Sequence, residues 1–300
     1  MVHNAAIVCL TRGYNDISQY STLIKRNNKL YENFNNRYNY PLIIFHEGNI
    51  TGQHQEHIFR NSNNQEISFV DIKEEFTWPS EVNQIRDNRF NLGYRMMCRF
   101  HSFYIWEHLK NYDYVLRVDE DGFIEKLDYD VFQYMQDNSY DYLTCRFMEE
   151  YHLLTNSTLP QAVESLIPDK FKLQDYDQTN FWIPYTNLYI AKTSFFLDNN
   201  VNKFLKDLIS MNDFLMNRWG DAPVHGITLK AFEGKISHIK DCVYRHGSHD
   251  CLVKDGRAMD GFLSEREGKF FNLQPIENSD VIEFDGQRLV KYEPKEAHSS

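Results

Sequence analysis

Three acidic side chains directly after an apolar segment are the strongest chemical signal in the chain. Asp119, Glu120 and Asp121 follow Tyr114–Val118, a run of residues that predicts a buried strand. Carboxylates two positions apart beyond a strand end converge on a hard divalent cation where the chain turns, and Gly122 permits such a turn. A cation held there keeps coordination positions for phosphate oxygens, as in DxD loops. The alternative interpretation is a solvated acidic turn.

The octet RWGDAPVH at 218–225 and the triplet Tyr244-Arg245-His246 hold two further candidates. Asp221 in the octet suits a helix cap, with Pro223 in the first turn, or a contact with a sugar hydroxyl. His246 suits a ligand for a transition metal or a polar packing residue. Spacing alone favours the structural role for both side chains.

Two arginines stand four positions apart in a segment with helical spacing. Arg95 and Arg99 therefore share one face of a predicted helix over 92–109. Two guanidinium groups on one face suit a diphosphate, and they equally suit ion pairs with the surplus carboxylates of this chain.

The elements that must position these residues alternate between strand and helix patterns. Strands are predicted at 5–10, 42–45, 67–72, 114–118, 140–147 and 188–196, and helices after 16 or 18, at 92–109 and at 201–214. This alternation predicts an α/β fold with a mostly parallel central sheet flanked by helices. Ligands bind at the carboxyl ends of the strands in such sheets, which is where the acidic triplet stands.

The chain divides into one large predicted domain over 1–251 and a C-terminal appendage over 252–300. The appendage contains a predicted β-hairpin at 281–292, with Asp285-Gly286 as its tight turn. No repeat or flexible linker interrupts the first 251 residues.

Composition excludes several classes of protein. The 300 residues carry 32 Lys+Arg against 43 Asp+Glu, a net charge of −11 that argues against nucleic acid as a partner. Five scattered cysteines without a CxxC pair give no support to a zinc knuckle. No apolar run is long enough to span a membrane, and no signal peptide is recognisable. We therefore expect a cytoplasmic protein or one associated with a virion or virus factory.

Taken in order, these segments resemble the fungal α-1,2-mannosyltransferases of glycosyltransferase family 15. The matching segments are Tyr94-Arg95-x-Met97-Cys98-Arg99-Phe100, Tyr112-Asp113-Tyr114, Arg117-Val118-Asp119, the octet at 218–225 and Tyr244-x-His246. The resemblance spans about residues 4–251, and the octet is its most specific part. It implies a GT-A type fold, a nucleotide-sugar donor (GDP-mannose), Mn²⁺ as cofactor, and retention of configuration at the anomeric carbon.

The resemblance also implies roles for particular residues. Asp119 stands where the family has the metal-binding Glu of a Glu-Pro-Asn/Gly triplet, Asp121 restores a DxD pattern, and His246 is the metal ligand from the C-terminal side. Tyr94 matches a tyrosine that contacts the donor. Asp221 and Glu149 match acidic residues near the reacting sugars, with the adjacent Glu150 as an alternative to Glu149.

One position departs from the family. Tyr189 stands where the family has a Glu in Asn-Phe-Glu-Ile-Ala that has been proposed as the nucleophile. A phenol with a pKa of about 10 is a weaker nucleophile than a carboxylate at neutral pH. The change implies a front-face mechanism without an enzyme nucleophile, a different donor or linkage, or an inactive homologue, and the intact metal set argues against the last.

These observations predict a metal-dependent hexosyltransferase that moves mannose from GDP-mannose to a hydroxyl of a glycan or glycoprotein. Arg95 or Arg99 is expected to assist at the diphosphate, and Arg12 and Glu47, near strand ends, at the nucleoside. Asp221, Glu149 and Tyr189 are expected around the sugar and acceptor. The alternatives are an inactive homologue that binds nucleotide sugars or glycans, a transferase for a UDP-sugar, and a metal-dependent sugar-nucleotide hydrolase.

Overall fold

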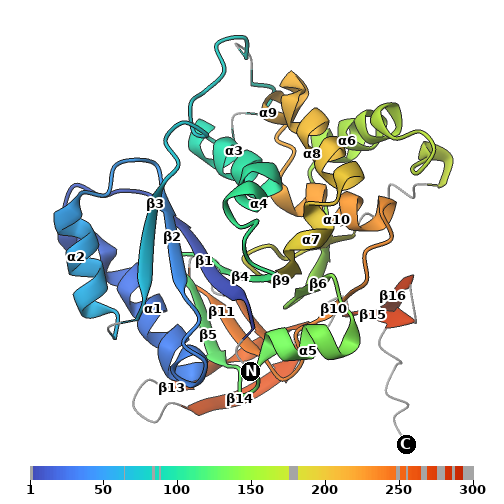
Figure 1. Ribbon diagram of the computed structural model, residues 1–300. Coiled ribbons are helices and arrows are strands. Elements are labelled where there is room, and N and C mark those ends of the chain that lie inside the picture. Colours follow the sequence, from blue (N-terminus) through green and yellow to red (C-terminus); the bar gives the residue numbers. More distant parts are fainter. Residues whose placement is uncertain are drawn as a thin grey trace, which may run out of the picture.

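The computed structural model describes most of the chain, from residue 3 to residue 292. The described residues are 3–63, 65–82, 85–87, 89–175, 182–247, 251–254, 256–264, 269–275, 281–285 and 288–292. Strands and helices alternate along it as far as residue 247, as the sequence predicts for an α/β protein (Figure 1).

A seven-stranded sheet forms the centre of the molecule, in the order β10-β6-β9-β4-β1-β2-β3. Its strands are β1 (Ala5–Thr11), β2 (Leu42–His46), β3 (Ile67–Asp71), β4 (Tyr114–Val118), β6 (Tyr142–Thr144), β9 (Leu188–Lys192) and β10 (Ile236–His238). All neighbouring pairs are parallel except those that β9 makes with β4 and β6. The predicted mostly parallel sheet is confirmed, with β9 as its antiparallel member.

Two groups of helices cover the two faces of this sheet. One face packs against α1 (Ser21–Asn33), α2 (Gly52–Asn61) and α5 (Val131–Asn138). The other packs against α3 (Leu92–Arg99), α4 (Ile105–His108), α6 (Leu153–Leu166), α8 (Asn199–Ser210), α9 (Asn212–Met216) and α10 (Asp221–Ala231). Figure 1 shows the two groups on opposite sides of the strands.

Strand β1 shows why this arrangement follows from its residues. Successive side chains of a strand point to opposite faces. Ala6 and Val8 accordingly lie in the core beneath α3 and α8, whereas Ala5, Ile7 and Cys9 lie in the core beneath α1 and α5. All five are buried, so an uninterrupted apolar run is required here rather than an alternating one.

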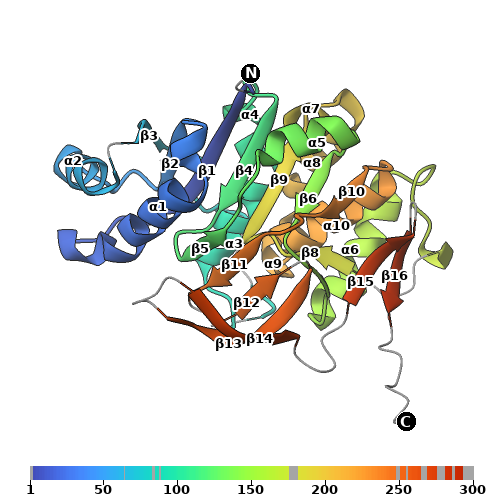
Figure 2. The ribbon, with the colours of Figure 1, turned by 90° about the horizontal axis from the view of Figure 1, so that it is seen from below.

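A second sheet of five antiparallel strands lies beside the first, in the order β14-β13-β12-β11-β5 (Figure 2). Its strands are β5 (Gly122–Lys126), β11 (Val243–His246), β12 (Cys251–Lys254), β13 (Arg257–Ser264) and β14 (Lys269–Pro275). β12 pairs with β11, so this sheet continues across the boundary predicted at residue 251. The division into a domain and an appendage stays a prediction.

The predicted C-terminal hairpin is present as two paired strands, whereas two other predicted elements end or divide differently from the sequence expectation. β15 (Val281–Asp285) and β16 (Arg288–Tyr292) pair antiparallel, whereas Gly286 in the predicted turn lies outside the described residues. The strand expected over 188–196 ends at Lys192, where α7 (Thr193–Phe196) begins. The helix expected over 201–214 is divided into α8 and α9 by the extended backbone of Met211.

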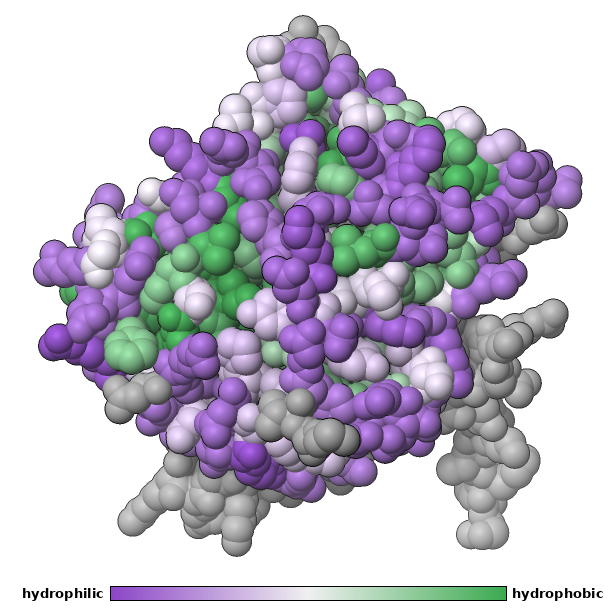
Figure 3. Space-filling model, viewed as in Figure 1, coloured by the Kyte–Doolittle hydropathy of each residue, from purple (hydrophilic) through white to green (hydrophobic). Residues whose placement is uncertain are grey.

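The surface is consistent with the acidic, polar composition. Figure 3 shows a mostly hydrophilic face with a hydrophobic area over β1–β3. In the part of the chain that the structure describes, no helix combines the length and apolarity needed to cross a lipid bilayer.

Candidate active site

A buried arginine at the carboxyl end of β4 organises the site. Arg117 is 3% exposed, and its Nε and Nη2 lie 3.0 and 2.9 Å from Oδ1 of Asp119. Its Nη1 donates to Oδ2 of Asp221 at 2.6 Å. One guanidinium therefore joins the loop after β4 to the first residue of α10.

This arrangement keeps both carboxylates ionised. Burial is the largest single influence on each group and opposes the charged form, but Arg117 and the neighbouring histidines together outweigh it and lower the pKa of Asp119 and of Asp221. Burial likewise opposes the charge on Arg117, and the two carboxylates nevertheless raise its pKa well above the ordinary value. Asp221 does not cap its helix, since Gly220 is the N-cap residue and the Asp221 carboxylate faces Arg117 instead.

The three side chains predicted to hold a metal are brought together by strand pairing. In the register of β5 with β11, His246 stands opposite Gly122, directly after the acidic triplet. Nε2 of His246 lies 3.3 Å from Oδ1 of Asp121 and 3.9 Å from Oδ2 of Asp119. Among the described residues, no three His, Cys, Asp or Glu side chains form a complete metal site, and these donors approach one another in pairs.

Asn187 joins two members of this group, a role that the sequence did not reveal. Its Nδ2 donates to Oδ2 of Asp119 at 2.7 Å and lies 2.8 Å from Nε2 of His246. In the neutral form with its proton on Nδ1, the His246 imidazole accepts from this amide through Nε2. A neutral imidazole nitrogen beside two carboxylates is a donor set that suits Mn²⁺, so the residues present fit the cation.

The middle residue of the acidic triplet faces the end of β1. Glu120 accepts hydrogen bonds at 2.6 Å from the hydroxyls of Thr11 and Tyr14. Arg12 donates its Nε to the Tyr14 hydroxyl at 3.3 Å. The Arg12 charge also opposes the burial effect that raises the pKa of Glu47. The residues expected at the nucleoside therefore gather at the carboxyl ends of β1 and β2, around a carboxylate of the acidic triplet.

Tyr94 belongs to a second cluster, on the side of α3. Its hydroxyl accepts a hydrogen bond from Nη2 of Arg218 at 2.8 Å, and Nη1 of Arg218 lies 3.4 Å from Oε2 of Glu150. Glu149, on β7 (Phe147–Glu149), accepts a 2.7 Å hydrogen bond from the hydroxyl of Tyr151. Of the two acidic alternatives in the sequence, Glu150 is the one that joins the Tyr94 cluster.

The guanidinium of Arg95 is engaged by backbone carbonyls. This buried group donates to the backbone carbonyls of Leu215 at 2.6 Å, of Phe90 at 3.1 Å and of Asp87. These bonds join α3 to the end of α9. The guanidinium of Arg99 lies 5.3 Å from the ring centroid of Tyr104. Although Arg95 and Arg99 are spaced to share one face of the helix, their guanidinium groups contact different partners.

Tyr189 lies inside the core rather than in an open site. Its side chain is fully buried and stacks on Tyr142 at 5.0 Å between ring centroids. The register of β4 with β9 sets it opposite Arg117, whose guanidinium lies 5.8 Å from its ring centroid. Burial raises the pKa of Tyr189 far above neutrality. In this position the phenol cannot attack a sugar.

His225 in α10 completes the packing behind the site. Its Nε2 donates to the carbonyl of His101 at 3.0 Å, and its Nδ1 accepts from the Tyr142 hydroxyl at 3.1 Å. Burial lowers the pKa of His225 to about 4. The imidazole is therefore neutral at physiological pH.

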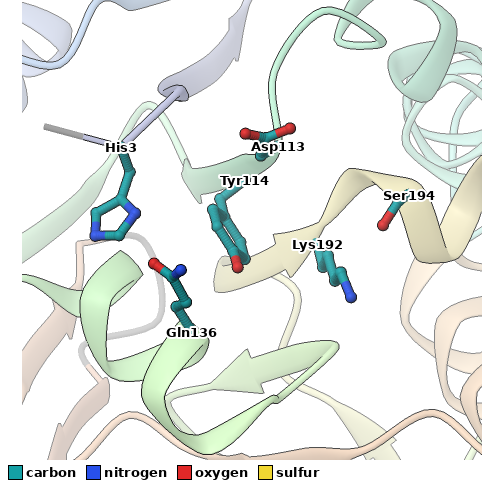
Figure 4. Close-up of a pocket in the computed structure, with 6 residues that line it drawn as sticks. All are labelled: His3, Asp113, Tyr114, Gln136, Lys192 and Ser194. Atoms are coloured by element: carbon teal, nitrogen blue, oxygen red, sulfur yellow. The ribbon is translucent and has the colours of Figure 1, made fainter.

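A cavity of about 230 Å³ lies at the opposite end of β4 and contains none of the predicted site residues. It is lined by His3, Asp113, Tyr114, Gln136, Lys192 and Ser194 (Figure 4). The polar groups that meet at the carboxyl end of β4, not this cavity, constitute the candidate site.

Sequence reasoning did not assign roles to Arg117, Asn187, Glu120 and Arg218. For Arg117 a signal was available, because a charged residue inside the apolar run YVLRV must find a buried partner. For Asn187 and Arg218 the signal lay only in their place beside Tyr189 and Asp221, and their partners are distant in sequence.

Comparison with known families agrees with this geometry. The family model described as glycolipid 2-alpha-mannosyltransferase matches residues 2–260. The chain belongs to this family. The sequence-based resemblance to fungal α-1,2-mannosyltransferases is thereby confirmed.

Curated relatives of this glycosyltransferase family are fungal. The chain is 29% identical over 286 residues to O-glycoside alpha-1,2-mannosyltransferase omh1 of Schizosaccharomyces pombe, covering 84% of this chain and 71% of that one. It is 28% identical over 249 residues to glycolipid 2-alpha-mannosyltransferase 1 of Candida albicans, covering 72% and 57%. It is 26% identical over 290 residues to glycolipid 2-alpha-mannosyltransferase of Saccharomyces cerevisiae, covering 86% and 64%. The chain thus spans from 57% to 71% of these relatives' lengths.

Solved structures of mannosyltransferases share the fold. Ktr4p from S. cerevisiae superimposes with a TM-score of 0.71 at 23% identity, covering 81% of this chain and 70% of that one. The Mn/GDP form of core-mannan synthase A from Aspergillus fumigatus gives 0.67 at 23% identity, covering 81% and 74%. The predicted GT-A type fold is confirmed.

The contacts of Arg95 generate a stability prediction. Arg95→Met removes the donor from four backbone carbonyls, so we expect the free energy of unfolding to fall by about 3 kcal/mol, measured by urea titration. Donor affinity of the folded variant changes less than about twofold, because no phosphate contact is lost. Arg99→Met on the same helix is the matched control, with a smaller effect. A large loss of donor affinity at unchanged stability would restore Arg95 to the donor site.

The buried His225 generates a pH prediction. The unfolded state takes up a proton near pH 6.5, whereas folded His225 does so only near its pKa of about 4. Stability therefore falls by about 3 kcal/mol as pH decreases from about 6.5 to about 4. The buried His101, whose pKa is also lowered by burial, acts in the same direction. Urea titrations across this range should show a shallower slope for His225→Gln, and an unchanged slope contradicts the assignment.

Proposed function

We propose that this chain is a metal-dependent mannosyltransferase that moves mannose from GDP-mannose, with retention, to a hydroxyl of a glycan or glycoprotein. The observation that carries the proposal is the meeting of Asp119, Asp121 and His246 beside the Arg117–Asp221 pair at the carboxyl end of β4. The names of related proteins support the donor, since core-mannan synthase A was solved in an Mn/GDP form and Ktr4p in complex with GDP.

Asp119, Asp121 and His246 are the residues that would hold Mn²⁺. A divalent cation supplies electrostatic stabilisation of the negative charge that develops on a departing diphosphate. Asn187 contributes by orientation, because its Nδ2 lies within hydrogen-bond distance of both the Asp119 carboxylate and Nε2 of His246.

Asp221 is the carboxylate that we assign to the reacting sugar. Arg117 keeps it ionised and fixes its Oδ2, and the remaining oxygen is available to a substrate hydroxyl or to positive charge at the anomeric carbon. Since the Tyr189 side chain is fully buried in the core, this position does not supply an enzyme nucleophile. We therefore favour the front-face mechanism, in which the acceptor attacks on the side from which the diphosphate leaves.

One observation favours a second function. Tyr189 occupies the place of a carboxylate, and loss of that charge is compatible with a protein that binds a nucleotide sugar without turnover. The two functions differ in one measurable outcome, which is the release or transfer of mannose during prolonged incubation.

A donor panel tests the proposal and identifies the base and sugar. GDP-mannose, GDP-fucose, UDP-glucose, UDP-galactose and UDP-N-acetylglucosamine are each added with and without Mn²⁺, and the melting temperature is measured. A ligand that binds only the native state raises the melting temperature by mass action. We expect an Mn²⁺-dependent rise with GDP-mannose alone, followed by mannose transfer to a mannoside. A rise with a UDP-sugar would replace the donor, and binding without turnover would select the second function.

Substitution of Asp121 tests the metal assignment. Asp121→Asn keeps the shape of the side chain and removes its charge, so we expect the Mn²⁺-dependent rise to disappear and turnover to fall about 100-fold. Asp128→Asn is the matched control and should behave as wild type. Asp128 has an exposed carboxylate and lies just beyond the C-terminal end of β5, the strand that begins directly after Asp121. Unchanged Mn²⁺ dependence in Asp121→Asn would remove this residue from the metal site.

Substitution of Glu120 tests the nucleoside end. Glu120→Gln weakens the hydrogen bonds from Thr11 and Tyr14, which hold the segment after β1 against the acidic loop. We expect the KM for GDP-mannose to rise about fivefold with little change in kcat, since the reacting atoms are not touched. Tyr14→Phe, which deletes one of the two bonds, should act in the same direction. If instead kcat falls and KM is constant, Glu120 acts at the chemical step.

A further inference from the structure

A buried carboxylate lies in β5, the strand that follows the acidic triplet. The Glu125 side chain is 1% exposed, and its Oε1 accepts from Nε and Nη2 of Arg245 on β11 at 3.2 and 3.1 Å. Its Oε2 lies 3.1 Å from Nζ of Lys29 on α1. The Arg245 guanidinium also lies 4.5 Å from the ring centroid of Phe123 on β5. Because a carboxylate withdrawn from water needs close counter-charges, Glu125 joins β5 to both of these neighbours.

Glu125 is also the extra residue of a β-bulge. In the pairing of β5 with β11, Val243 stands opposite Lys126, and the next residue, Tyr244, stands opposite Ile124. One step along β11 thus corresponds to two steps along β5, and Glu125 is the residue passed over. A bulge of this kind redirects the side chains beyond it, and it occurs often beside active sites.

The bulge decides where His246 lies. Regular pairing continued from Val243 would set His246 opposite Phe123, whereas the bulge sets it opposite Gly122, directly after the acidic triplet. One residue advances an antiparallel strand by about 3.4 Å. Nε2 of His246 lies 3.3 Å from Oδ1 of Asp121, so a slip of one residue would separate these two groups.

The register of β5 needs side-chain support, because backbone hydrogen bonds alone do not distinguish one register from the next. In the described part of the chain, β5 is the last strand of the five-stranded sheet and pairs with β11 (Figure 2). Lys29 and Asn33, one turn apart on α1, both bind the bulge. Lys29 contacts the Glu125 carboxylate, and Nδ2 of Asn33 donates to the carbonyl of Ile124 at 2.9 Å. The bulge is therefore fastened to a helix on one side and to Arg245 on the other.

We propose that Glu125 is a positioning residue, which fixes this bulge through Arg245 and Lys29 and so holds His246 in register with the acidic triplet. The inference rests on the proposed function and deepens it, because the register then determines how tightly the site holds a divalent cation. Glu125 is not a ligand in this proposal, and its carboxylate acts through the strand that carries His246.

Amide hydrogen exchange in metal-free protein tests the register directly. The N–H of Gly247 donates to the carbonyl of Asp121 at 2.8 Å, a bond that depends on the observed register. The N–H of Ile7, bonded to the carbonyl of Pro41 in the central sheet, reports opening of the whole domain. In Glu125→Gln we expect exchange at Gly247 to become about tenfold faster relative to exchange at Ile7.

Titration with Mn²⁺ alone tests the consequence for the cation. The EPR signal of the free ion should give a Kd about tenfold higher for Glu125→Gln than for wild type. Arg245→Met removes the other partner and should change both quantities in the same direction, and it decides the matter if Glu125→Gln does not fold. Glu75→Gln, at a carboxylate 2.8 Å from Nε2 of His108, is the matched control and should leave both quantities unchanged.

The outcomes separate this inference from the proposed function. Unchanged relative exchange at Gly247 in a folded Glu125→Gln variant overturns the positioning role. Faster exchange with an unchanged Kd for Mn²⁺ also overturns the proposal, because the register then does not govern the cation. If wild type does not bind Mn²⁺, the metal assignment of the proposed function fails, and exchange at Gly247 alone decides whether Glu125 holds the register.

Discussion

The burial of the Arg117 guanidinium is the constraint on which the site depends. A cation enclosed at the end of a central strand is tolerated only with close, well-oriented counter-charges, because its desolvation costs several kcal/mol. Asp119 and Asp221 supply them, and in doing so they tie the acidic loop to the start of α10. The position and charge of the carboxylate that we assign to the sugar thus follow from the requirement to neutralise a strand residue.

The second sheet provides the other half of the site. β5 continues directly from the acidic loop, and its pairing with β11 sets His246 beside the carboxylates. Asn187, at the turn into β9, then binds both Asp119 and His246. Three segments that are distant along the chain are brought together by backbone pairing, so the spacing of the donors is determined by sheet register rather than by loop conformation.

The aromatic core explains how the chain accommodates Tyr189. The phenol ring is enclosed by Tyr142 and by Arg117 across the strand pair, and Trp106 stacks on Phe196 behind them at 3.9 Å. A large, polarisable ring fills volume and offers its face to the guanidinium, which a small carboxylate does not do. Position 189 therefore contributes packing and orientation, and the ionised groups near the sugar are confined to Asp221 and the acidic loop.

Local sequence pattern determines much of the fold of this protein. Apolar runs such as residues 5–10 and Tyr114–Val118 predicted buried strands, because a strand that is covered on both faces needs apolar side chains on both. Their alternation with helical segments predicted the sheet, and the triplet after β4 predicted where ligands meet. The ordered motifs predicted the family.

Only the tertiary structure decided what each polar side chain does. Arg95 has the spacing of a phosphate ligand, yet it binds the carbonyls of Asp87 and Phe90, which are close in the chain, and those of Leu215 and Met216, which are distant in the chain and close in space. Asp221 has the position of a helix cap, yet its carboxylate accepts a hydrogen bond from Arg117, a buried arginine on β4. The function of a charged or polar group depends on the partner that neutralises it. Here those partners lie as many as about a hundred residues away in the chain. Sheet register and helix packing bring them within reach, and a local sequence pattern does not contain this information.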